Sequence, residues 1–107
     1  MRAGTTLTFY FQVHQPFRVR PYQYDEIGKN HAFFDDWLNE DVVKRVTSLC
    51  YLPMNDVLSR AIDRTDGAVK CAFSISGTAL RQFELWAPEA LESFAELAEK
   101  RDSVEFF

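Results

Sequence analysis

Residues 7–16 read Leu-Thr-Phe-Tyr-Phe-Gln-Val-His-Gln-Pro, and this stretch decides the fold. Its first seven positions place a large apolar residue at every second position, which is the period of a β-strand. The opposite face carries Thr8, Tyr10 and Gln12, a mixture that is typical of a strand covered on both sides. Pro16 cannot donate to a β-ladder, so the strand ends before it and His14 stands at the carboxyl end.

Two later stretches have the same alternation, over residues 69–75 and residues 104–107. Between the three stretches the apolar spacing is helical, over residues 42–49, from Pro53 to Ile62, over residues 80–86 and again after Pro88. Strands that alternate with helices predict a parallel sheet with right-handed crossovers. The expected fold class is therefore α/β, with about three parallel strands and intervening helices.

The same spacing predicts details of the helices. We expect Asp36 or Asn39 to cap the first helix and a new helix to begin at Pro53. The inner side of the last helix is predicted to comprise Leu91, Phe94, Ala95 and Ala98.

The composition limits the classes of function. The 107 residues are 47% hydrophobic and 26% charged, which is typical of one globular domain. The net charge is −4, so the chain lacks the basic surplus with which proteins bind nucleic acid or an anionic membrane surface. The polar start and the lack of a long apolar run predict a soluble, cytoplasmic protein. Cys50 and Cys71 have no metal-ligand spacing, and we expect both to be reduced, buried thiols.

A long segment without a regular period follows the first strand. Residues 14–36 are rich in rings, namely Phe17, Tyr22, Tyr24, Phe33 and Phe34. Loops longer than about 12–15 residues are uncommon in compact domains unless they have a function. In α/β sheets and barrels the ligand site lies at the carboxyl ends of the strands, where this segment begins. We therefore interpret it as a binding loop.

The sequence ends at Phe107, inside an apolar stretch and without a polar tip. Natural termini are usually exposed and polar. We expect residues 1–107 to be the N-terminal portion of a longer protein, interrupted within its third strand.

The stretch Phe11-Gln12-Val13-His14-Gln15-Pro16-Phe17-Arg18-Val19-Arg20 resembles the opening of glycoside hydrolase family 57, whose first signature motif is His-Gln-Pro. Three later stretches are similar to members of that family in the same order, namely Cys50-Tyr51-Leu52-Pro53, Phe73-Ser74-Ile75-Ser76-Gly77 and Trp86-Ala87-Pro88-Glu89. The resemblance spans nearly the whole chain. It implies that residues 1–107 are the N-terminal part of an incomplete (β/α)7 catalytic barrel.

The resemblance also implies a chemistry. Members of the family hydrolyse or transfer α-glucans such as starch, glycogen or maltodextrin, as α-amylases and 4-α-glucanotransferases do, with retention of configuration and without an obligatory metal or cofactor. Retention needs two carboxyl groups about 5–5.5 Å apart. The resemblance implies a glutamate after the fourth strand and an aspartate near the last, and neither position is reached by Phe107. We expect no catalytic residue and no activity within residues 1–107 alone.

Substrate-binding residues are implied at both ends of the chain. His14 matches the motif histidine that lines the sugar subsite, with Gln15 beside it, and Glu105 matches a glutamate of the second motif. From the pattern alone, Glu105 lies on the opposite face of its strand from its neighbours, and a carboxylate buried in a barrel is expected to need a partner. Three further residues are weaker candidates for contacts with sugar, namely Arg18, Tyr22 and Trp37.

Several polar residues have ordinary structural explanations. Asp35-Asp36 is interpreted as a helix-capping pair rather than a metal site. Arg18 and Arg20 are expected to pair with Asp25 and Glu26, and His31 is interpreted as a loop histidine. Ser74 and Ser76 lack a nucleophile elbow, so we interpret them as strand-end and helix-capping residues.

Two alternative functions stay open from the sequence. A metal-dependent polysaccharide deacetylase has a related barrel, but its ion needs a clustered set of ligands, and this chain has only His14 and His31. A standalone carbohydrate-binding or interaction module would have to fold and bind maltodextrin without further strands. We expect it not to, because unpaired sheet edges favour aggregation.

Overall fold

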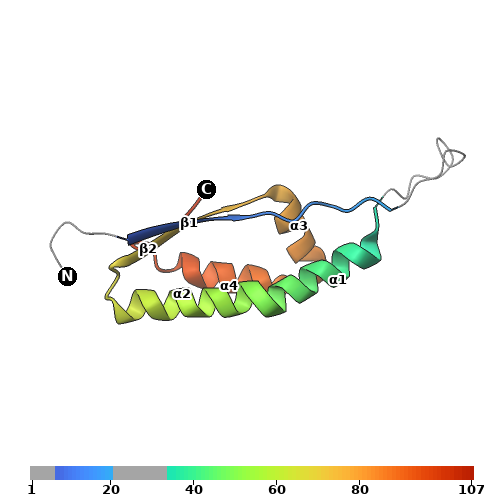
Figure 1. The fold of residues 1–107 in the computed structure, drawn as a ribbon. Helices are drawn as coiled ribbons and strands as arrows, with labels where there is room; N and C mark the ends of the chain where they lie inside the picture. Colours follow the sequence, from blue (N-terminus) through green and yellow to red (C-terminus); the bar gives the residue numbers. More distant parts are fainter. Residues whose placement is uncertain (1–6, 21–33) are drawn as a thin grey trace, which may run out of the picture.

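The structure is a computed structural model that describes residues 7–20 and 34–107 (Figure 1). Three parallel strands, β1 (Leu7–Val13), β2 (Val69–Ile75) and β3 (Val104–Phe106), form one sheet in the order β1-β2-β3. Between β1 and β2 lie α1 (Asp36–Val46), the π-helical turn η2 (Thr47–Tyr51) and α2 (Leu52–Arg64). Between β2 and β3 lie α3 (Gly77–Trp86) and α4 (Pro88–Ala98). The predicted α/β class, with three parallel strands and helices between them, is confirmed.

The helix layer covers one face of the sheet. Helices α1, α2 and α4 run beneath it, and α3 descends to them from the carboxyl end of β2 (Figure 1). In a doubly wound fold the helices lie on both faces, whereas in a (β/α) barrel they all lie outside the strands. This one-sided arrangement, with sequential strand order, agrees with an N-terminal part of a (β/α) barrel.

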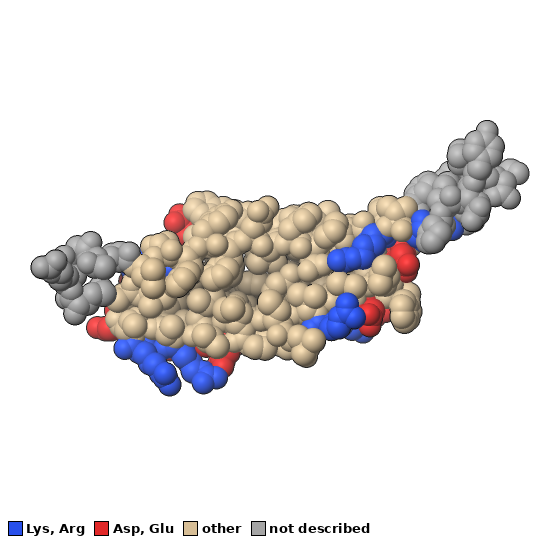
Figure 2. Space-filling model, viewed as in Figure 1, with Lys and Arg blue, Asp and Glu red and all other residues tan. Residues whose placement is uncertain are grey.

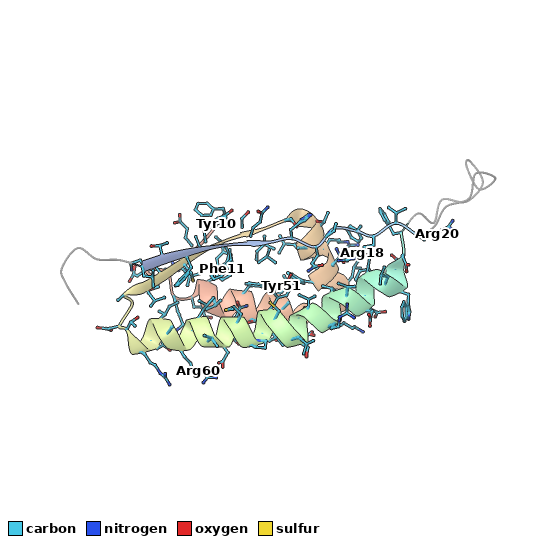
Figure 3. The ribbon with its side chains drawn as sticks, in the orientation of Figure 1. Tyr10, Phe11, Arg18, Arg20, Tyr51 and Arg60 are labelled. Atoms are coloured by element: carbon cyan, nitrogen blue, oxygen red, sulfur yellow. The ribbon has the colours of Figure 1, made fainter. Side chains whose placement is uncertain are left out.

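The opposite face of the sheet is bare in the described part of the chain. Thr8, Tyr10 and Gln12 are exposed, and Tyr10 points away from the helices while Phe11 points toward them (Figure 3). The prediction that β1 is covered on both sides is thus wrong for these residues. The alternation was interpreted correctly, but it does not reveal that both crossovers return along the same face.

Aromatic rings form the core between the sheet and the helices. Phe11, Phe73 and Phe106 are neighbours in the strand register, and their ring centroids are 5.4 and 5.3 Å apart across the three strands. Phe94 of α4 packs edge-on against Phe73 at 5.5 Å. Phe73 is 2% exposed, so this cluster ties all three strands to the helix layer.

Helix α2 begins at Leu52 with Pro53 in its first turn, so the predicted helix start at Pro53 is confirmed to within one residue, but the π turn η2 joins α2 to α1 without a break. Proline in a helix lacks a donor and its ring crowds the carbonyl four residues earlier. Here the π turn precedes it, and Leu52 N–H reaches back five residues to Thr47 O. The wider turn offsets the carbonyl from the proline ring and lets the helix continue.

The helix ends agree with prediction in part. Asp35 caps α1, with its Oδ1 accepting from Leu38 N at 3.0 Å, and Asp36 lies in the first turn, so the capping role predicted for the Asp35-Asp36 pair is confirmed, whereas Asn39 is not the cap. In α4 the buried residues are Ala90, Phe94 and Leu97, so the prediction is confirmed for Phe94 and wrong for exposed Ala95. Because α4 also packs against α2 and α3, its buried side is rotated away from the predicted stripe.

Charge is unevenly distributed on the surface. In Figure 2 the charged side chains among the described residues gather toward the two ends of the view, and the middle, over β1 and the long helix, is almost uncharged. Large apolar side chains are exposed on β1, where Leu7 is 56% and Phe9 40% exposed. Within the described residues, no helix is both long and apolar enough to cross a membrane.

Candidate functional site

The candidate site lies at the carboxyl end of the sheet, where His14 follows β1. Its Nδ1 lies 2.8 Å from the Oγ of Ser76, the residue that follows β2. The backbone N–H of Ser76 donates to Val13 O at 3.0 Å, and its side chain caps α3 by accepting from Ala79 N at 3.1 Å. One serine therefore holds the imidazole, the end of β1 and the start of α3 together. The predicted capping role of Ser76 is confirmed.

Gln15 lies on the helix side of the same tripeptide. It is 8% exposed, its Nε2 donates to the Tyr51 hydroxyl at 2.9 Å, and its Oε1 accepts from Arg18 Nη2 at 3.1 Å. The two neighbouring side chains thus point to opposite faces: His14 is exposed, and Gln15 is anchored among the helices. The role of Gln15 in binding substrate stays a prediction, and the geometry gives this residue an anchoring position.

Gln82 is a second anchor, and the sequence reasoning missed it. This α3 residue is fully buried, and its Nε2 donates to Gln15 O at 2.7 Å and to Pro16 O at 3.2 Å. Its Oε1 has no partner among the described residues. Its only sequence signal is a polar amide next to Phe83 in an otherwise apolar stripe. The His-Gln-Pro backbone is therefore held by a side chain 67 residues away.

Arg18 fixes the course of the chain after the tripeptide. The Oδ1 of buried Asn39 accepts from Arg18 N at 2.8 Å, and Asp35 N donates to Arg18 O at 2.8 Å. The Arg18 guanidinium donates to Gln15 Oε1 and to Pro16 O, and it lies near α1 (Figure 3). Its predicted partners, Asp25 and Glu26, lie outside the described residues, as do Tyr22, Tyr24 and His31.

The two stems of the long loop are joined. Val19 and Phe34 form an isolated antiparallel bridge, and the Phe17 and Phe34 rings lie 5.2 Å apart. The two stems of the segment predicted to be a binding loop therefore meet beside the start of α1, six residues beyond the carboxyl end of β1 (Figure 1). Trp37 follows in α1 and is 75% exposed, so it is not packed onto the sheet within the described residues.

Glu105 lies on the bare face, two strands away from β1. It is level with Ala72 and, through it, with Tyr10. Glu105 is exposed, so within the described residues it does not need the partner that burial would require. The Tyr10 and Phe107 ring centroids are 6.4 Å apart across β2. The bare face thus carries two rings, a carboxylate and, at its carboxyl end, an imidazole.

The described residues contain no cluster of metal-ligating side chains, and their two cysteines differ in exposure. No group of three or more His, Cys, Asp or Glu side chains among the described residues is arranged to hold a metal ion. Cys71 is buried, as predicted, and burial raises the pKa of its thiol. Cys50 is exposed, so its predicted burial is wrong: the π turn places it on the outer side of the helix.

An acidic groove of about 240 Å³ lies between α2 and α4 on the helix layer. It is lined by four carboxylates, namely Asp56, Glu89, Glu92 and Glu96, together with Asn55, Ser59, Ser93 and two leucines. These acids belong to the helices, whereas the residues at the carboxyl ends of the strands are His14, Ser76 and Phe107. The groove and the carboxyl end of the sheet are therefore separate places.

Comparison with known proteins decides the family. Residues 8–107 match the model of glycosyl hydrolase family 57, which is nearly the whole chain. The chain belongs to glycosyl hydrolase family 57. The resemblance carried by the His-Gln-Pro stretch is thereby confirmed.

A relative of this family 57 chain occurs in Methanocaldococcus jannaschii, under the name "Putative alpha-amylase". The two are 33% identical over 104 residues, which is 92% of this chain and 21% of the relative. The chain thus spans about a fifth of the length of that relative. No solved structure matches the chain.

Proposed function

We propose that residues 1–107 form the first part of a retaining, α-glucan-active family 57 enzyme, an α-amylase or 4-α-glucanotransferase, and that they supply part of its sugar site. One observation carries the proposal: the motif histidine is exposed at the carboxyl end of a parallel sheet whose helices, among the described residues, leave the face of His14 bare. In a (β/α) barrel that edge is where substrates bind.

The open edges of the sheet support the proposal that these three strands are only part of a barrel. Among the described residues no strand pairs with the outer edge of β1 or β3, and β1 leaves Leu7 and Phe9 exposed. Unpaired strands with apolar side chains are normally covered by further strands or elements. Additional barrel strands would cover these edges and would supply the two catalytic carboxyl groups.

The geometry of the bare face supports a site the size of a short chain of linked sugars. Glu105 is two strands across from Tyr10, and His14 is four residues beyond Tyr10. At ~3.3 Å per residue and ~4.8 Å per strand, the His14 and Glu105 Cα atoms are ~16 Å apart. Both side chains extend from the same face and so do not close this distance, and the space between their polar atoms suits a short chain of linked sugar rings rather than a single ring. Tyr10 and Phe107 add apolar ring surface below it.

Kinetics of the complete protein that contains residues 1–107 tests the proposal. The wild type is expected to act on maltooligosaccharides. Removing a hydrogen bond to substrate typically costs about 1–3 kcal/mol, so His14→Ala should lower kcat/KM about tenfold to a hundredfold without lowering the melting temperature. Arg60→Ala is the matched control, because Arg60 extends from α2 away from the sheet (Figure 3). Unchanged turnover in His14→Ala would remove His14 from the site.

Product analysis in the same assay distinguishes the two reactions. Hydrolysis raises the number of reducing ends, whereas transfer produces longer glucans at a constant number. Retention predicts that the first product formed keeps the α configuration. Release of the β-anomer, or no action on α-glucans, would contradict the proposal.

A further inference from the structure

The Ser76 hydroxyl has two further hydrogen-bond partners besides the backbone N–H that it caps. Its Oγ accepts from Ala79 N at 3.1 Å, lies 3.2 Å from Thr78 Oγ1, and lies 2.8 Å from His14 Nδ1. A serine hydroxyl has one proton to donate and can accept two hydrogen bonds. The cap takes one accepting position, so the proton and the second accepting position serve Thr78 and His14.

Two arrangements are open: Ser76 donates to His14 and accepts from Thr78, or it donates to Thr78 and accepts from His14. The position of Ser76 at a helix start decides between them. The N-terminus of a helix carries a partial positive charge, which attracts a lone pair and repels a polarised N–H. His14 Nδ1 faces the residue that caps the ten-residue helix α3. The favoured arrangement therefore has Thr78 donating to Ser76 Oγ, and Ser76 donating to a lone pair on His14 Nδ1.

We propose that Ser76 is a positioning residue that fixes the His14 imidazole in the tautomer with its proton on Nε2. Nδ1 is then occupied by the serine, and Nε2 is the ring nitrogen left for a ligand. His14 thereby presents an N–H donor, and it recognises an oxygen acceptor such as a sugar hydroxyl or ring oxygen. This inference rests on the proposed function, because it assigns a direction to a hydrogen bond of that site.

Three variants separate the tautomer role from helix capping. Ser76→Thr keeps a hydroxyl that can cap and can donate. Ser76→Asp keeps the cap, because aspartate caps as well as serine, but its carboxylate only accepts and so draws the proton to Nδ1. Ser76→Ala removes both the cap and the donor.

The first measurement is the ¹⁵N NMR shift of the His14 ring in the complete protein labelled with ¹⁵N-histidine. A His14→Gln sample assigns the signal, and spectra are recorded at about pH 8.5, above the ordinary imidazole range of about 6.5. Wild type and Ser76→Thr should show protonated Nε2 and bare Nδ1, and Ser76→Asp should show a proton on Nδ1. A wild-type ring protonated on Nδ1, or one pattern shared by all three proteins, overturns the proposal.

The second measurement is kinetic, with a maltooligosaccharide as substrate. Ser76→Thr should stay within about threefold of wild type, while Ser76→Asp should lose about tenfold to a hundredfold in kcat/KM at an unchanged melting temperature, the size expected when one substrate hydrogen bond is lost. Equal activity of the two variants overturns the proposal. If Ser76→Asp does not fold, the ¹⁵N spectra of the His14 ring in Ser76→Ala, which lacks the donor, and in Ser76→Thr, which keeps it, are compared instead. Identical spectra for these two variants overturn the proposal. A wild type inactive on α-glucans contradicts the proposed function alone, because the ring shifts still report the tautomer.

Discussion

Replacing Gln82 by glutamate tests the anchor beneath the His-Gln-Pro segment. The substitution keeps the size and shape of the side chain but exchanges an amide donor for an oxygen. In the fully buried native position, that oxygen would lie about where Nε2 now meets Gln15 O at 2.7 Å and Pro16 O at 3.2 Å. The other oxygen of the side chain has no donor beside it among the described residues. A carboxylate there is repelled and desolvated, so the pKa of the new carboxyl is raised and the folded protein holds it protonated.

The expected loss in the free energy of unfolding follows from the cost of keeping this carboxyl protonated. Keeping a carboxyl with an unfolded pKa of about 4.3 protonated costs about 1.4 kcal/mol per pH unit above it, so the loss is about 4 kcal/mol at pH 7 and about 1 kcal/mol at pH 5. Because the folded-state pKa is the higher one, the folded state binds more protons. The destabilisation of Gln82→Glu therefore grows as pH rises and disappears as pH falls through the unfolded pKa.

The assay is thermal or urea unfolding of the complete protein, as wild type and as Gln82→Glu, at pH 5 and pH 7. The control is Glu84→Gln, which changes an exposed residue of the same helix that pairs with Arg81 at 3.3 Å. Exposed pairs contribute about 0–1 kcal/mol, so the control should show little difference at either pH. Equal stability of Gln82→Glu and wild type at pH 7, or the same loss at both pH values, would refute the inference that the Gln82 amide holds these carbonyls.

Three further outcomes follow from the structure. Phe73→Ala should cost about 3–5 kcal/mol in the free energy of unfolding, since Phe73 is 2% exposed at the centre of the ring cluster; a loss below about 1 kcal/mol would contradict that packing. Tyr51→Phe should cost about 1–2 kcal/mol, because the hydroxyl that accepts from buried Gln15 is lost, and an unfolding midpoint equal to wild type would argue against that bond. Of the two cysteines, Cys50 should react with a thiol reagent in the native protein at pH 8 and Cys71 only after unfolding, because Cys71 is buried and its thiol pKa is raised; mass spectrometry of the labelled peptides reads the result, and native labelling of Cys71 would contradict it.

The strands could be predicted because their signal is local. Residues 7–13 and 69–75 alternate along their whole length, and β1 and β2 have these bounds. The third strand, Val104–Phe106, was recognised by the same alternation. The right-handed crossovers were predicted, but the period of two does not contain the strand order. Because the order is β1-β2-β3, both right-handed crossovers return along the same face and leave the other face bare, and no single stretch of sequence records that order.

The polar anchors of the candidate site could not be predicted, because each joins residues far apart in the chain. Gln15 contacts Tyr51 and Gln82, and Arg18 contacts Asn39. Each of these side chains looks like an ordinary surface residue in its own stretch of sequence. The π turn was missed for a related reason: the rule that proline begins a helix is local, and the extra residue that accommodates Pro53 lies in the preceding turn.

A crystal structure of the complete protein with a bound, slowly cleaved maltooligosaccharide analogue tests the account most directly. We expect one sugar ring at the carboxyl end of the sheet, with an oxygen within about 3.2 Å of His14 Nε2, a normal hydrogen-bond distance. Glu105 should face the same ligand from β3. A sugar seated instead in the acidic groove between α2 and α4, with His14 untouched, would contradict the central claim.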